Sequence, residues 1–242
     1  MAEPPNDWNA QLAVRSRISG DLLEVLPMKG SWTAHEVTLA LRLHRPAPHL
    51  TLRLFVGNEP MDPRRTLEQL GVTEVQFIQV DYLADQHLNE QWRRMEEDLQ
   101  HLTPEVLYDL GQERSPPHED LYLVLRAVAL LVQPDSDLSW LSMRRMLCHR
   151  GNFRETLRSF CIDDVPFEVL LKFRDTVAKA HFDRDRLRMR NLKAGWLSSW
   201  VLVMYQFVAA KLDFYGMGLG YPSLMNPRVF WRFNKSSEPP AI

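Results

Sequence analysis

Cysteine is scarce in this sequence, with only Cys148 and Cys161 among 242 residues. Two cysteines are too few for a disulfide framework in a chain of this length, and such usage suits a reducing compartment. Together with His149 and His181 they match no standard zinc-ligand spacing, so we expect them to be structural and predict no metal site.

Long apolar runs are lacking as well. The longest, residues 200–210, is about half the length that a membrane-spanning helix needs, and Gln206 interrupts it. The first residues do not show the charged start and apolar stretch of a secretory signal. We therefore expect a cytoplasmic protein with no membrane partner.

Signatures of catalysis are also missing from the sequence. There is no glycine-rich loop with a following lysine to hold nucleotide phosphates, so ATP hydrolysis by that route is not expected. Gly216, Gly218 and Gly220 are closely spaced, but they lack the flanking strand and helix of a dinucleotide fingerprint. No spacing of Asp and His residues indicates an active site. The sequence favours a binding protein over an enzyme, with no catalytic residue, no cofactor and no nucleic-acid partner.

Charge is unevenly distributed along a chain whose formal net charge is only −2. Residues 84–138 carry four Lys or Arg against twelve Asp or Glu, whereas residues 139–193 carry thirteen against seven. One interpretation is a basic surface that binds an acidic partner. The other is that the acidic and basic blocks neutralise each other within one fold.

Residues 11–82 show the patterns of a small sheet that holds one helix. Thr33 can cap the helix, Glu36 follows three residues later as in a capping box, and Pro46 and Pro48 end it. Strands are expected at residues 12–18, 22–27, 50–56 and 75–82. This order of elements within about 70 residues is that of a ubiquitin-like roll, an α+β domain.

Residues 55–67, Phe-Val-Gly-Asn-Glu-Pro-Met-Asp-Pro-Arg-Arg-Thr-Leu, resemble the ubiquitin stretch that runs from Phe-Ala-Gly to Asp-Gly-Arg-Thr-Leu. The resemblance implies a ubiquitin-like β-grasp fold and a partner protein. Arg53 is a departure, since ubiquitin buries a leucine there, and it leaves the strand register open. Beyond Val80 the chain continues without a Gly-Gly terminus, so conjugation to another protein is not expected.

From residue 84 the apolar spacing becomes helical. Apolar residues alternate at spacings of four and three, as in the seam of a coiled coil, and Thr103-Pro104 predicts a break and restart of the helix. Residues 84–113 are thus expected to form one kinked arm. The seam residues are Leu88, Trp92, Met95, Leu99, Leu102, Val106 and Leu110.

Residues 99–211 resemble the stalk tip of dynein heavy chains, the microtubule-binding domain of that family. The closest likeness is residues 191–205, Asn-Leu-Lys-Ala-Gly-Trp-Leu-Ser-Ser-Trp-Val-Leu-Val-Met-Tyr, which is similar to the family's Ser-x-Ala-x-x-x-Leu-Cys-x-Trp-Val-x-x-Met-x-x-Tyr. The other matching features are, in chain order, Pro116-Pro117, residues 121–131, Trp140, Phe153, Leu157, Phe160, residues 163–166 and Phe182.

The resemblance implies an all-α cap on a short antiparallel coiled coil, made by the arm and a returning helix at about residues 185–214. In the family such a cap docks on tubulin, whose outer surface is acidic. The implied contacts are Arg144, Arg145 and Arg150 at the second cap helix, Arg154 and Arg158 on the third, and Arg184, Arg186, Arg188, Arg190 and Lys193 on the last.

On that last helix, Arg186, Arg190 and Lys193 are expected to share a face. The first cap helix departs from the family, because it opens with Glu119 and Asp120, and these acids would oppose an acidic lattice.

The sequence thus predicts an α+β chain with a ubiquitin-like domain (residues 11–82), a dynein-tip-like helical domain (84–214) and an extended tail (215–242). We expect a non-motor microtubule-associated protein of the cytoskeleton, in a ciliary or flagellar axoneme, that binds tubulin through the helices and a second protein through the ubiquitin-like domain. The alternative is an adaptor that uses both domains for protein contacts without touching tubulin. An enzyme of the ubiquitin system is a third interpretation, but no catalytic cysteine motif supports it.

Overall fold

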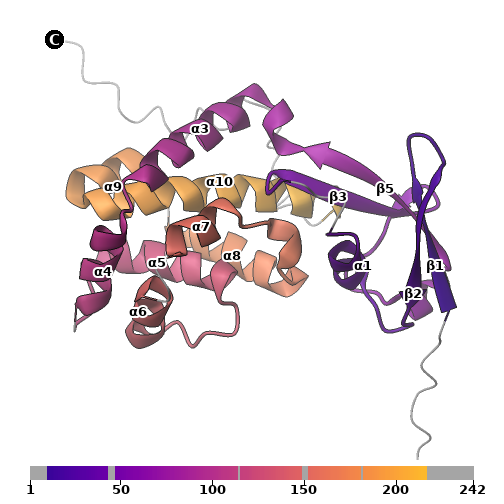
Figure 1. Ribbon diagram of the computed structural model, residues 1–242, viewed down its shortest axis with the longest axis horizontal. Coiled ribbons are helices and arrows are strands. Elements are labelled where there is room, and N and C mark those ends of the chain that lie inside the picture. The colour runs from indigo at the N-terminus through magenta and orange to yellow at the C-terminus, as the bar shows by residue number, and fades with distance from the viewer. Residues whose placement is uncertain (1–9, 43–46, 114, 149–151, 181, 217–242) are drawn as a thin grey trace, which may run out of the picture.

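The computed structural model describes residues 10–42, 47–113, 115–148, 152–180 and 182–216. A five-stranded mixed sheet with its helix lies at one end, and helices make up the rest (Figure 1). We call residues 10–81 the sheet half and residues 82–216 the helical half. The predicted α+β class is confirmed, and every regular element among the described residues of the helical half is a helix. The predicted tail beyond residue 216 lies outside the described residues.

The sheet has the strand order β2-β1-β5-β3-β4. β1 and β5 are parallel, and the other neighbouring strands are antiparallel. The predicted strand at residues 50–56 coincides with β3, and the other three predicted strands differ from the observed ones by one or two residues at their ends. The short β4 was not predicted. The elements are β1 (Ala10–Ser16), β2 (Leu22–Met28), α1 (Ala34–Ala40), β3 (Leu50–Val56), β4 (Glu59–Pro60), α2 (Leu67–Leu70) and β5 (Glu74–Asp81).

Local capping sets both helices of the sheet half. Thr33 and Glu36 form the predicted capping box of α1. The side chain of each residue accepts a hydrogen bond from the backbone N–H of the other. The same arrangement, with Thr66 and Gln69, starts α2, which the sequence analysis did not predict. Gly71 then ends α2 in the left-handed region at φ 63°, where glycine is favoured.

The position of Arg53 follows from the alternation of side chains between the two faces of β3. Leu52 and Leu54 are buried on the side of the sheet's own core, with 1% and 0% of their surface exposed. The side chain of Arg53 therefore points to the other face, where its guanidinium lies 4.9 Å from the ring centroid of Phe214. The arginine faces the helical half, so the strand register is consistent with a leucine core.

The helical half holds eight α-helices and two 3-10 turns among the described residues. They are η2 (Tyr82–Ala84), α3 (Gln86–Gln100), α4 (Pro104–Gln112), α5 (Glu119–Val132), α6 (Trp140–Cys148), α7 (Phe153–Arg158), η3 (Ile162–Asp164), α8 (Phe167–Ala180), α9 (Arg184–Arg190) and α10 (Leu192–Phe214).

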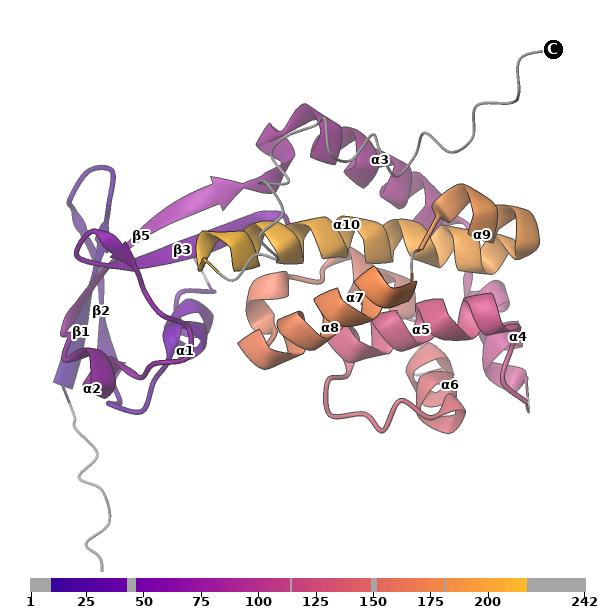
Figure 2. The same ribbon diagram turned by 180° about the vertical axis from the view of Figure 1, so that it is seen from behind.

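α3 and α10 pack antiparallel in heptad register. Asp98 on α3 bonds Ser199 on α10, and Gln91, seven residues earlier on α3, bonds Gln206, seven residues later on α10. α5 and α8 lie on the other side of α10 (Figure 2). α10 is therefore apolar nearly all round, as expected of a central helix.

The predicted arm is wrong beyond the break. Thr103 caps α4 and Pro104 occupies its first turn, as expected, but α4 leaves α10 and packs on α6. The guanidinium of Arg144 on α6 donates to the carbonyl of Gly111 on α4 over 2.7 Å. Of the two arm helices, α3 is the one that pairs with α10. Its share of the predicted seam lies in or against the helical core: Leu88, Trp92, Met95 and Leu99.

The returning helix is also not continuous. Asn191 is extended, with φ −151° and ψ 110°, and its side chain caps α10 by accepting from the backbone N–H of Ala194. α9 consequently folds back on α10. Gly195 permits the close approach, because a Cβ at that position would lie 2.6 Å from the Cβ of Arg188.

Candidate functional site

Nine of the ten predicted tubulin contacts lie on four helices. The tenth, Arg150, lies outside the described residues. Arg144 and Arg145 are on α6 and Arg154 and Arg158 on α7, as predicted. Arg184, Arg186, Arg188 and Arg190 are on α9, and Lys193 begins α10. The prediction that Arg186, Arg190 and Lys193 share the face of one helix is wrong, because the chain turns at Asn191.

Several of these cations are paired with acids of the acidic block. Arg158 lies 3.0 Å from Glu96, and Arg190 lies 3.7 Å from Asp120. Arg154 pairs locally with Glu155 at 3.5 Å. Part of the basic block is therefore neutralised inside the fold, as the second interpretation of the charge pattern required.

Asp98 is the most buried of these acids, with its side chain 5% exposed. The guanidinium of Arg184 donates to it at 2.8 Å, Ser199 donates a hydrogen bond, and Arg188 lies 3.9 Å away. A buried carboxylate needs such partners, since its charge is costly to remove from water. Arg184 thus has a structural task in joining α3, α9 and α10.

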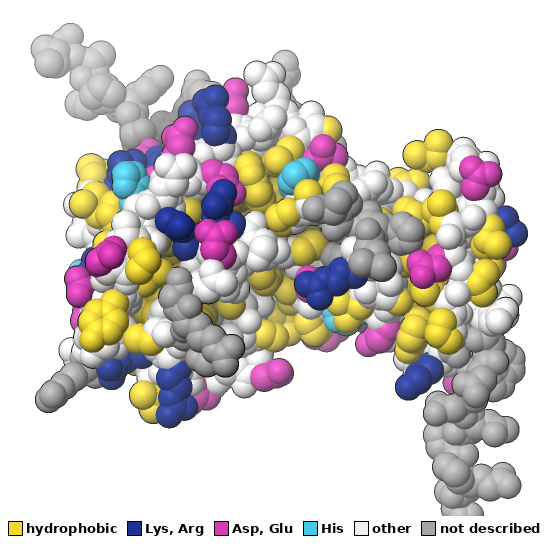
Figure 3. All heavy atoms as spheres, viewed as in Figure 1, with side chains coloured by type: hydrophobic (Ala, Val, Ile, Leu, Met, Phe, Trp, Pro, Cys, Tyr) yellow, Lys and Arg dark blue, Asp and Glu magenta, His cyan; other side chains and the backbone are white. Residues whose placement is uncertain are grey.

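The cations that remain available are Arg145, Arg186 and Lys193. They form no ion pair within 4.0 Å with any residue that the structure describes. Arg186 and Lys193 stand on the two sides of the turn at Asn191, whereas Arg145 is on α6. On the face drawn in Figure 3, basic side chains are interspersed with acidic ones.

The acidic start of α5 is partly neutralised too. Asp120 lies 3.7 Å from the guanidinium of Arg190, and its side chain is 17% exposed. Glu119 remains exposed at the start of the helix. The expected opposition to an acidic partner is therefore reduced to one of the two carboxylates.

Asp163 joins the two halves, a role that the sequence analysis missed. Its carboxylate is fully buried and accepts from the hydroxyl of Thr51 at 2.8 Å, the backbone N–H of Leu52 at 3.0 Å and the ammonium of Lys211 at 2.6 Å. Thr51 and Leu52 belong to β3, and Lys211 to α10. The pKa of Tyr82 is raised above its usual range, mainly by burial of its hydroxyl and further by the negative charge of Asp163.

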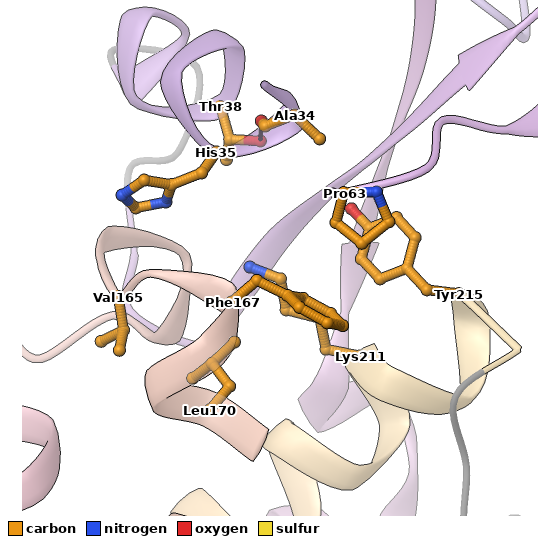
Figure 4. Close-up of a pocket in the computed structure, with 9 residues that line it drawn as sticks. All are labelled: Ala34, His35, Thr38, Pro63, Val165, Phe167, Leu170, Lys211 and Tyr215. Carbon is orange, nitrogen blue, oxygen red and sulfur yellow. Dashed lines mark hydrogen bonds between the residues drawn. The ribbon is translucent and has the colours of Figure 1, made fainter. Parts of the chain in front are cut away.

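A shallow hollow lies beside this junction, between α1, α8 and the end of α10. His35, Phe167, Lys211 and Tyr215 are among the residues that line it (Figure 4). Its free volume is about 10 Å³, far below the several hundred Å³ of a typical ligand pocket. The hollow is thus a feature of the junction and too small for an organic ligand.

The described ranges of the chain hold no group of three or more His, Cys, Asp or Glu side chains arranged to bind a metal ion. Within the same ranges, no helix combines the length and the apolar character that crossing a membrane requires. The turn between α9 and α10, with Arg186 and Lys193 on its two sides, is the candidate binding feature among the described residues.

No protein-family model, no curated protein and no solved structure matches this chain.

Proposed function

We propose that the chain is a non-motor microtubule-associated protein whose helical half is a dynein-tip-like cap that binds tubulin. The observation that carries the proposal is that the residues behind the family resemblance meet in a single core. Trp200, fully buried on α10, donates its indole N–H to the carbonyl of Leu157 on α7 at 2.9 Å. The other motif residues in or against this core include Trp140, Phe153, Phe160, Phe182, Val201, Met204 and Tyr205.

The arrangement of α3 and α10 supports the same proposal. In the dynein family the cap sits where two antiparallel helices meet, and here α3 and α10 are antiparallel in heptad register. α3 has 15 residues, which corresponds to a length of about 22 Å. The pair is a stub, which fits a protein that holds its cap close to a second module.

Electrostatics supports an acidic partner for the cap. Arg186 and Lys193 remain without an acid within ion-pair distance among the described residues, and Asp120 is held near Arg190. Exposed cations accelerate association with an acidic surface at moderate salt. A tubulin lattice is such a surface, and we place the protein on it in a cytoskeletal or axonemal setting.

The sheet half is proposed to be a ubiquitin-like β-grasp domain that binds a second protein. The strand order, with parallel β1 and β5 at its centre and α1 over one face, supports this fold. The hairpin of β1 and β2 carries four exposed apolar side chains that a partner could cover: Ile18, Leu22, Leu23 and Val25. Because Asp163 ties the two halves together, this partner would be held at a fixed position relative to the microtubule.

Co-sedimentation with microtubules tests the proposal. The protein should pellet with them in a saturable manner at low salt, and binding should weaken as salt rises. Failure to pellet at low salt would rule out the microtubule proposal.

The second candidate function is a protein-protein adaptor that does not contact tubulin. The observation that favours it is the pairing of Arg158, Arg184, Arg188 and Arg190 with acids of the same chain. These pairs show that much of the basic block serves the fold. Lack of pelleting together with a stable, folded protein would favour this adaptor.

A further inference from the structure

The sheet has two edges, and the fold covers one of them. At the β3–β4 edge the backbone N–H of Leu52 donates to Asp163 at 3.0 Å, and the carbonyl of Leu54 accepts from the N–H of Met61 at 2.9 Å. At the other edge, no strand lies beyond β2 among the described residues. An uncovered edge presents unpaired backbone groups to which another strand can bond.

The backbone of Val25 points toward this free edge. Val25 lies opposite Ala13 of β1, and Ala13 donates its N–H to Thr73 at 2.9 Å, on the β5 side of the sheet. The two residues are therefore a pair without mutual hydrogen bonds, so Val25 directs its N–H and C=O away from β1. Pro27, two residues later, faces the same way and offers only a carbonyl. The register shift beside Val14 limits the free backbone on the other side, so pairing is centred on Val25.

The side chains of β2 add apolar surface to this free backbone. Leu22, Leu23 and Val25 are 49%, 44% and 45% exposed. Glu24, the charged residue within the strand, is opposite buried Val14 and so lies on the face away from Val25. The other exposed large apolar residues that the structure describes lie on turns or helices, without an unpaired strand beside them: Ile18, Leu39, Tyr108, Leu141, Met189 and Leu192.

The charges at the two ends of β2 define the strand that fits it. Asp21 precedes β2 and Lys29 follows it, and both are exposed. Neither has an ion-pair partner among the described residues. Antiparallel pairing of two identical strands brings Asp21 of each toward Lys29 of the other, whereas parallel pairing would bring like charges together. A second copy of the chain therefore complements β2 in charge and in apolar surface.

We propose that two copies of the chain pair antiparallel through β2, with Val25 opposite the partner's Val25 at the twofold axis. The joined sheet would end at the covered β3–β4 edge of each copy, so assembly stops at the dimer. β1 and β2 lie at the end of the molecule away from the helical half (Figures 1 and 2), so both helical halves remain accessible. This inference rests on the protein-binding role proposed for the sheet half and does not require tubulin binding.

Sedimentation equilibrium of the full chain measures the dimer dissociation constant. Wild type should show a monomer–dimer equilibrium. Val25→Lys and Val25→Glu should each weaken the dimer at least about tenfold, because like charges would meet at the twofold axis. An equimolar mixture of these two variants should regain the dimer, since opposite charges then meet. The control Leu141→Lys, at a 54% exposed position of α6, should dimerise as wild type does.

The charges at the strand ends test the antiparallel direction. Asp21→Lys and Lys29→Asp should each weaken the dimer about fivefold, as expected for exposed pairs. The double variant Asp21→Lys/Lys29→Asp should restore it, because each strand again carries opposite charges at its ends. A double variant that is weaker than both single variants would overturn the antiparallel arrangement.

A folded wild type that remains monomeric at about 100 μM would overturn the dimer, and pelleting of that monomer with microtubules would leave the proposed tubulin binding in place. Dimerisation that Val25→Lys leaves intact would overturn pairing through β2. Variants of Val25 that stay monomeric when mixed would overturn the twofold axis at this residue. A dimer that does not pellet with microtubules would contradict tubulin binding and support this inference.

Discussion

Replacing Asp163 by alanine should destabilise the protein more than most single changes. The carboxylate is fully buried and is the shared acceptor for Lys211, Thr51 and the backbone of Leu52. The side chain of Lys211 is itself only 11% exposed, so the change leaves a nearly buried ammonium without its acid. Loss of one partner of a buried pair typically costs about 3–5 kcal/mol of unfolding free energy.

The matched control is the neighbouring Asp164→Ala. Asp164 lies 3.2 Å from Arg42, whose side chain is 71% exposed, and such exposed pairs contribute about 0–1 kcal/mol. Asp163→Ala combined with Lys211→Met should be less destabilised than Asp163→Ala alone, since it removes the unpaired charge. Urea unfolding followed by circular dichroism gives all these free energies, and a cost below about 1 kcal/mol for Asp163→Ala would refute the reasoning.

Three further changes test other parts of the structure. Burial lowers the pKa of His35 below its usual 6.5, so the unfolded chain binds the proton more readily than the folded protein. The free energy of unfolding should therefore fall as the pH drops below about 6.5, and His35→Gln should reduce that fall in urea titrations. Gly195→Ala should lower the melting temperature, at a cost of about 1–3 kcal/mol, because its Cβ would meet Arg188; a rise would contradict the packing. Arg184→Ala should cost about 3 kcal/mol by removing the main cationic partner of the buried Asp98 carboxylate, whereas Arg186→Ala should stay within about 0.5 kcal/mol.

Local patterns explain what could be predicted from the sequence. The capping box of Thr33 and Glu36 and the proline after Thr103 involve neighbouring residues, so a short window contains the whole signal. The heptad spacing on α3 likewise required only the period of its apolar residues. These features follow from backbone geometry that holds in any fold.

Two missed features had a local signal. Thr66 and Gln69 have the spacing of a capping box, which would have predicted α2. Asn191 is a strong N-cap residue three positions before Ala194, which would have placed the break between α9 and α10. In both cases a stronger pattern nearby, the strands or the apolar run of α10, dominated the interpretation.

The junction and the ion pairs had no local signal. Asp163 meets Thr51, which is 112 residues away in the chain, and Arg184 meets Asp98, which is 86 residues away. Spacing along the sequence carries no information about such contacts. For this reason the sequence could indicate a basic block but could not separate Arg184, which stabilises the fold, from Arg186, which is available for binding.

Microtubule affinity of the double variant Arg186→Glu/Lys193→Glu, measured by co-sedimentation against salt, tests the central claim most directly. The account predicts saturable binding of wild type at low salt, loss of binding in the double variant, and an unchanged melting temperature, since these charges have no ion-pair partner among the described residues. The control Arg93→Glu/Arg94→Glu, at exposed positions of α3, should bind as wild type does. Wild-type binding that both double variants retain would contradict the claim that Arg186 and Lys193 meet tubulin, and a wild type that does not pellet would contradict microtubule binding altogether.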